Sequence, residues 1–179
     1  MADMYAREAD RTLDYEREAT EVVEEGELVY REEGGGVRAF DPATDTRIDG
    51  IIPHREVGDR LTETMEEYVP YDEVYEYDVG DGPIPIQPLQ VNDLIAPRTV
   101  RDDTETEPTF VKNEEVGIAT IAGEQSVVPA GYTDSAGTQY GDGGAGEYVK
   151  LGLVDAAPSK YEQTTFAERI ETRVSGENL

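Results

Sequence analysis

Short apolar runs recur along most of the chain, separated by glycine, proline and acidic residues. From residue 26 onward many of these runs alternate with polar positions, as β-strands do. Glycine-rich turns such as residues 34–36 separate several of them. The sequence predicts a mainly β fold, either a small β-barrel or a β-sandwich with extended terminal arms. The predicted strands are residues 27–31, 37–40, 51–52, 71–79, 92–96, 109–111, 116–121, 126–128 and 148–154.

The clearest predicted strand covers residues 148–154. Simple alternation places Val149, Leu151 and Leu153 on one face of this strand and Lys150 on the other. The three apolar side chains are therefore expected to face the core together, with the lysine directed toward solvent.

Two segments follow a helical period instead of a strand period. Residues 57–68 have an apolar side chain at every third or fourth position, which predicts a short amphipathic helix. Phe166, Ile170 and Val174 are four residues apart and predict a second short helix, over residues 165–174, or a docking tail.

The chain divides into three regions by composition. Residues 1–25 lack glycine and proline and are rich in acids, which favours an N-terminal arm. Residues 26–156 form the predicted β-rich domain, in which residues 68–90 are a tyrosine- and proline-rich connector. Within the connector, residues 83–89 contain three prolines and are expected to be an extended contact arm, because proline has no amide to donate to a sheet. Residues 157–179 form the predicted C-terminal tail.

The acidic charge limits the possible partners and setting. Asp and Glu number 41 against 15 Lys and Arg, for a net charge of −26. Such a charge is typical either of disorder or of a protein adapted to high salt. The acids are spread through the whole chain between apolar runs, which favours salt adaptation, and at about 1 M salt the Debye length is only about 3 Å. The charge argues against a nucleic-acid partner, because phosphate must be neutralised by Lys and Arg.

Little in the sequence indicates catalysis, so an enzyme is not expected. There is no cysteine, and His54 is the only histidine, which excludes thiolate chemistry and multi-histidine metal sites. Residues 141–146 read G-x-G-x-x-G, but a polar loop precedes them and a strand-like segment follows, so a mobile surface loop is expected and not a dinucleotide site. No catalytic, cofactor or metal residue is predicted, although loose cation binding by the carboxylates stays open.

Neither a membrane nor an export signal is expected. No apolar stretch approaches the length needed to cross a bilayer. The first residues lack the basic start and apolar run of a signal peptide.

Aromatic and apolar residues in the segments least suited to a core are candidates for contact with a partner. Tyrosine offers a large contact area with few rotatable bonds and is common in interfaces. Half-buried strand tyrosines are the alternative interpretation. The interface candidates are Tyr68, Tyr71, Tyr75, Tyr77, Ile84, Ile86, Phe166 and Ile170.

Residues 26–154 resemble the small β-rich decoration, or cement, proteins of tailed-virus heads. The resemblance is carried by residues 26–29 (Gly-Glu-Leu-Val), 117–119 (Gly-Ile-Ala) and 146–152 (Gly-Glu-Tyr-Val-Lys-Leu-Gly). It implies a non-enzymatic virion protein that binds the major capsid protein on the capsid surface, commonly as a trimer, with terminal arms that tie neighbours together. Together with the acidic composition it implies a virus of a halophilic archaeon. The alternatives are a tail or head–tail connector component and a non-viral halophilic β-sandwich binding module.

A weak internal similarity is also present. Residues 26–29 followed by 49–51 resemble residues 92–95 followed by 116–118. This is either a duplicated strand unit or a pattern that any glycine-punctuated β protein shows.

Overall fold

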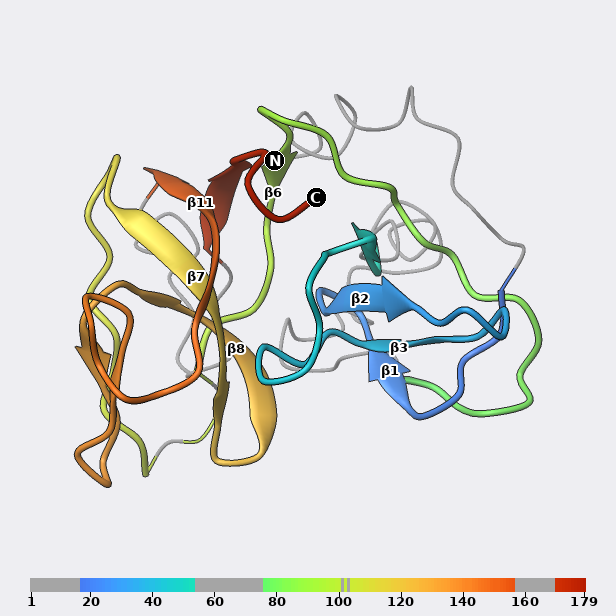
Figure 1. Ribbon diagram of the computed structural model, residues 1–179, viewed down its shortest axis with the longest axis horizontal. Helices are drawn as coiled ribbons and strands as arrows, with labels where there is room; N and C mark the ends of the chain where they lie inside the picture. Colours follow the sequence, from blue (N-terminus) through green and yellow to red (C-terminus); the bar gives the residue numbers. More distant parts are fainter. Residues whose placement is uncertain (1–16, 54–75, 101, 103, 157–169) are drawn as a thin grey trace, which may run out of the picture.

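A mainly β structure is formed by the described part of the chain, and every regular element there is a strand. The computed structural model describes residues 17–53, 76–100, 102, 104–156 and 170–179 (Figure 1). The described strands form separate sheets that do not close into a barrel. The predicted mainly β class is confirmed in its sandwich-like form. The helix predicted for residues 57–68 lies outside the described residues.

The larger sheet has five antiparallel strands. In spatial order they are β6 (Leu94–Ile95), β12 (Glu171–Val174), β11 (Val149–Ala156), β7 (Glu115–Ile121) and β8 (Glu124–Pro129). β7 and β8 form a hairpin in which Ile121 pairs with Glu124. The turn residues Ala122 and Gly123 both have positive φ, of 51° and 84°, which suits the right-handed twist of the strands. Residues 109–111, predicted to be a strand, are irregular.

The end of the chain belongs to this sheet and is not a separate tail. β12 lies between β6 and β11, and Thr172 pairs with a residue of each. Ile170, Thr172 and Val174 are 0%, 0% and 2% exposed. The helix predicted for residues 165–174 is therefore wrong for residues 171–174. Positions four apart share a face of a strand as well as of a helix, so the apolar spacing did not distinguish the two.

The smaller main sheet contains the strands predicted over residues 27–31, 37–40 and 51–52. Its order is β3 (Val37–Ala39), β2 (Leu28–Arg31) and β4 (Gly50–Ile51). β2 pairs with β4, whereas β6, at the similar stretch later in the chain, pairs with β12. The two stretches thus have different pairings, which argues against a duplication. Two short ribbons complete the described strands: β1 (Val23–Glu24) with β5 (Glu76–Tyr77), and β9 (Tyr132–Thr133) with β10 (Gln139–Tyr140).

The N-terminal segment covers one edge of the three-stranded sheet. The amide of Val37 donates to the carbonyl of Glu18 (3.0 Å), and the amide of Thr20 donates to the carbonyl of Val37 (2.9 Å). Ala19 between them is buried. An open edge would leave unpaired backbone groups, so this segment completes the sheet. The prediction of a separate arm over residues 1–25 is wrong for the part that is described.

The proline-rich connector covers the other edge and is not an exposed arm. Ile51 and Gln87 exchange both backbone hydrogen bonds (3.0 and 2.9 Å), and the amide of Ile84 donates to a carbonyl of the N-terminal segment (2.9 Å). The three prolines have no amide to donate, but residues such as Ile84 and Gln87 between them keep theirs and make these bonds. Extended geometry then directs Ile84 and Ile86 inward, where both are fully buried.

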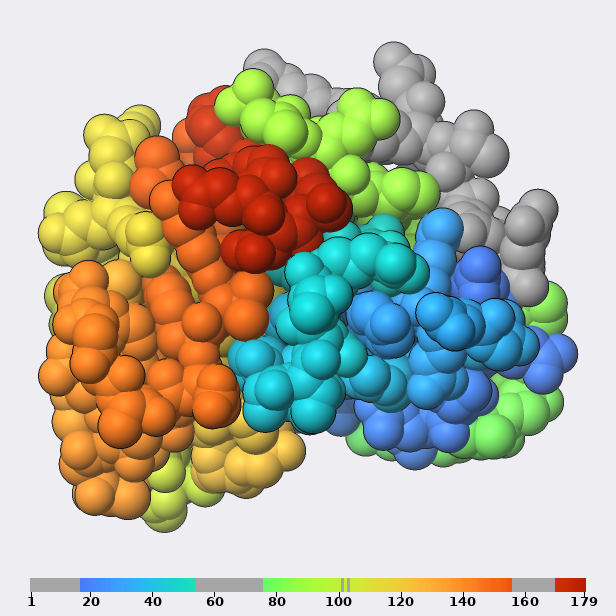
Figure 2. Space-filling model, viewed as in Figure 1, coloured from blue at the N-terminus to red at the C-terminus, as the bar shows by residue number. Residues whose placement is uncertain are grey.

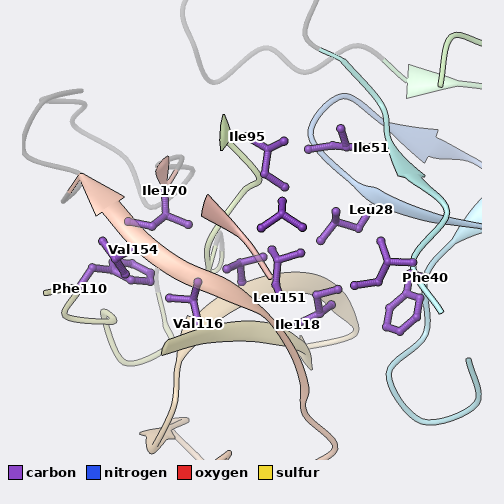
Figure 3. Packing of buried hydrophobic residues seen from close by; sticks show 13 residues of the cluster. Leu28, Phe40, Ile51, Ile95, Phe110, Val116, Ile118, Leu151, Val154 and Ile170 are labelled. Atoms are coloured by element: carbon purple, nitrogen blue, oxygen red, sulfur yellow. The ribbon is translucent and has the colours of Figure 1, made fainter. Parts of the chain in front are cut away.

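Apolar side chains fill three clusters. The largest lies between the two main sheets, where Leu28 and Phe40 of the smaller sheet meet Ile118 and Leu151 of the larger one (Figure 3). The second cluster lies on the opposite face of the smaller sheet, and the third on the opposite face of the larger sheet. Each main sheet is therefore buried on both faces over part of its area. Burial of one such side chain contributes about 1.5–3 kcal/mol.

Polar groups near the chain end and after β6 also connect the segments around the larger sheet with those around the smaller sheet. The side-chain amide of Asn178 donates to the carbonyl of Lys150 (2.8 Å), while its backbone carbonyl accepts from the amide of Ile48 (2.7 Å). Figure 2 shows the C-terminal residues lying across this junction. The guanidinium of Arg98, 4% exposed, donates through Nε to the carbonyl of Glu25 (2.6 Å).

Candidate interaction surface

The predicted interface residues do not gather on one described surface. Ile84, Ile86 and Ile170 are each 0% exposed, so the prediction that they contact a partner is wrong for the folded chain. A side chain that is fully buried within its own chain has no exposed surface with which to contact a second protein. Tyr77 is half-buried in β5 and packs against the cluster behind the smaller sheet. Four further candidates lie outside the described residues: Tyr68, Tyr71, Tyr75 and Phe166.

A different surface emerges on the larger sheet, on the face turned away from the central cluster. Leu153 of β11 pairs with Glu115 of β7 on one side and with Arg173 of β12 on the other. Directly paired residues of antiparallel strands lie on the same face. Leu153 is 39% exposed, and we call the surface around this row of three residues the β7–β11–β12 face.

Leu153 reaches this face because β11 does not alternate regularly. Its register against β7 shifts at Gly152, and Leu151 and Val154 are both buried in the central cluster. The prediction that Leu153 shares a face with Val149 and Leu151 is therefore wrong. A Cβ atom at Gly152 would collide with the backbone of β12, so glycine permits the bulge. A glycine inside a strand pattern is the sequence signal that was available for this feature.

Charges of both signs surround Leu153. The Nζ of Lys150 lies 3.4 Å from a carboxylate oxygen of Glu115 and 3.0 Å from one of Glu177. Arg173 pairs with Asp155 at 2.5 Å. The hydrogen bond to Glu177 raises the pKa of Lys150 above its ordinary value. Exposed pairs of this kind contribute only about 0–1 kcal/mol to folding, so their arrangement matters more for what the surface can contact.

The tyrosines near this face pack inward. The hydroxyl of Tyr132 donates to the carbonyl of Thr106 (2.7 Å), and that of Tyr140 donates to a carboxylate oxygen of Asp134 (3.1 Å). Burial raises the pKa of Tyr132 to about 12 and also raises the pKa of Tyr148. These three side chains belong to the third apolar cluster, which explains them as structural residues.

The glycine-rich loop of residues 141–146 is a hydrogen-bonded turn between β10 and β11. The amide of Gly144 donates to the carbonyl of Gly141 (2.8 Å), and the amide of Gly146 donates to the carbonyl of Gln139 (2.9 Å). Three successive residues have positive φ, of 70°, 49° and 78°. A strand follows the loop, as predicted, whereas a dinucleotide site requires the N-terminus of a helix at this point.

Among the described residues, no group of three or more His, Asp or Glu side chains is placed to hold a metal ion. No helix in the described part of the chain is long and apolar enough to cross a membrane. In comparisons with known protein families, with curated proteins and with solved structures, no match to this chain was found.

Proposed function

We propose that this protein is a structural subunit of a virus particle, a decoration protein that binds the major capsid protein on the outer surface of the head. In this proposal it acts as a homo-oligomer, carries out no catalysis, and belongs to a virus of a halophilic host. Its role is to add contacts between neighbouring capsid subunits.

The observation that carries the proposal is the position of the three segments that resemble decoration proteins. Residues 26–29 lead into β2, residues 117–119 lie in β7, and residues 146–152 lead into β11. β7 and β11 are direct neighbours, and a Cβ atom at Gly117 would collide with the ring of Tyr148. Tyr148, in the segment of residues 146–152, thus requires glycine at position 117, in the segment of residues 117–119. This contact supports treating these two segments as one motif.

The charge distribution supports the halophilic part of the proposal. In the described residues, five cationic side chains each lie 3.0 Å or less from a carboxylate oxygen: Arg38, Arg47, Arg98, Lys150 and Arg173. Over the whole chain, 41 acids against 15 basic residues leave a net charge of −26. Their mutual repulsion is strong in dilute buffer and nearly absent at molar salt. Such a surface suits a particle that is exposed to brine.

Mass spectrometry and electron microscopy of purified particles from cells that carry the gene test this function. We expect the chain in the particles at a simple ratio to the major capsid protein, with an antibody against it labelling the outside of the head. Stripped particles should rebind the purified protein. Labelling of the tail or connector would favour that alternative, and absence from the particles would favour a non-viral binding module.

A further inference from the structure

We propose that the β7–β11–β12 face is a self-association surface on which a second copy of this chain docks about a two-fold axis parallel to β11. This inference does not depend on the proposed virion function. It differs from the trimer that the resemblance implies, because a two-fold interface closes with two chains.

The apolar centre of this face is exposed. Leu153 is 39% exposed and lies between Glu115 and Arg173 in the row. Covering Leu153 by another protein surface would remove apolar area from water.

The order of charges across the strands selects a second copy as the partner. The row reads Glu115, Leu153, Arg173, which is acid, apolar and base. A two-fold axis along β11 through Leu153 reverses this order in the second copy. Glu115 of each copy then lies opposite Arg173 of the other, and the two Leu153 side chains meet on the axis. The row is therefore complementary to itself, as an isologous interface requires.

The charge balance of the face also permits contact between two copies here. The ion-paired cluster has two cationic groups, on Lys150 and Arg173, against three anionic ones, on Glu115, Asp155 and Glu177. The whole chain carries a net charge of −26, so two copies repel each other over most of their surfaces. A nearly balanced face lets them approach with little local repulsion.

Sedimentation equilibrium of the purified full chain in concentrated KCl tests the central contact. We expect wild type to show a monomer–dimer equilibrium, and Leu153→Asp to be monomeric at the same concentrations with an unchanged circular dichroism spectrum. Val79→Asp is the matched control, since Val79 is 62% exposed on another part of the surface, and this variant should dimerise like wild type.

Charge reversal tests the two-fold geometry independently. Glu115→Arg alone and Arg173→Glu alone should each weaken dimerisation by about tenfold or more, measured at the lowest salt at which the chain stays folded. A mixture of these two variants should form a heterodimer, because each copy then supplies the charges that the other needs. Misfolding of either variant could not produce this recovery.

Several results would overturn the inference. They are a monomeric wild type, an assembly of three chains, a Leu153→Asp variant that dimerises normally, and a mixture of the charge variants with no gain over either alone. The charge variants keep the test decisive if Leu153→Asp alters the fold.

Discussion

The side-chain amide of Gln125 on β8 binds the backbone of Leu28 on β2 in both directions. The amide of Leu28 donates to Oε1 of Gln125 (2.8 Å), and Nε2 of Gln125 donates to the carbonyl of Leu28 (2.9 Å). The same Nε2 also donates to the carbonyl of Phe40 (3.0 Å). One side chain thus acts as the backbone of a neighbouring strand would, and it joins the two main sheets beside the central apolar cluster.

Replacing Gln125 by Leu should lower the free energy of unfolding by about 1–3 kcal/mol, because backbone groups of Leu28 and Phe40 lose their partner. Urea unfolding in concentrated KCl would measure it. Gln125→Glu keeps the shape but loses the donor, and it should also destabilise. Gln139→Leu, at an exposed position, is the control. Equal stability of Gln125→Leu and wild type would show that this contact does not hold the sheets together.

Gly152→Ala should destabilise the chain by about 1–3 kcal/mol, since the new methyl group must be accommodated against the backbone of β12. Gly34→Ala is the control, because a Cβ atom there meets nothing within 4 Å, and its stability should differ little from that of wild type. The same urea experiment compares them. If the two alanine variants are equally stable, the bulge in β11 does not require glycine.

Stability should fall at alkaline pH through Tyr132. Burial raises the pKa of this phenol from 10.0 to about 12, so its neutral form is favoured in the folded state. Its contribution is complete below pH 10 and is lost as the pH rises from 10 to about 12. The unfolding free energy measured across this range should decline less steeply in Tyr132→Phe than in wild type. Parallel declines would contradict the assignment to Tyr132.

Folding should depend on salt. In concentrated KCl the repulsion among the 41 acidic residues is screened, and we expect a β-type circular dichroism spectrum. In dilute buffer the repulsion acts over longer distances and the spectrum should lose structure. A salt series followed by circular dichroism measures this. Identical spectra at low and high salt would mean that the acidic composition has another cause.

Local pattern was sufficient for part of the fold. The strands β2 and β3 with the glycine turn between them, and the strands β7 and β8, follow from alternation and glycine position within a few neighbouring residues. The mainly β class follows from the same signals. None of these features requires knowledge of which distant segment lies alongside, and this is why the sequence predicted them.

Tertiary structure decided which apolar residues face inward. Ile84, Ile86 and Ile170 look like contact residues in sequence because prolines or acids surround them, yet the segments they belong to complete sheets formed by distant residues. Leu153 looks like a core residue, and the bulge at Gly152 turns it outward.

The candidate surface was not predictable from the sequence for the same reason. Glu115, Leu153 and Arg173 come from three strands, and they form one row only because β11 pairs with β7 on one side and with β12 on the other. Strand order and register depend on contacts between residues far apart in the chain. Alternation within one segment carries no information about them.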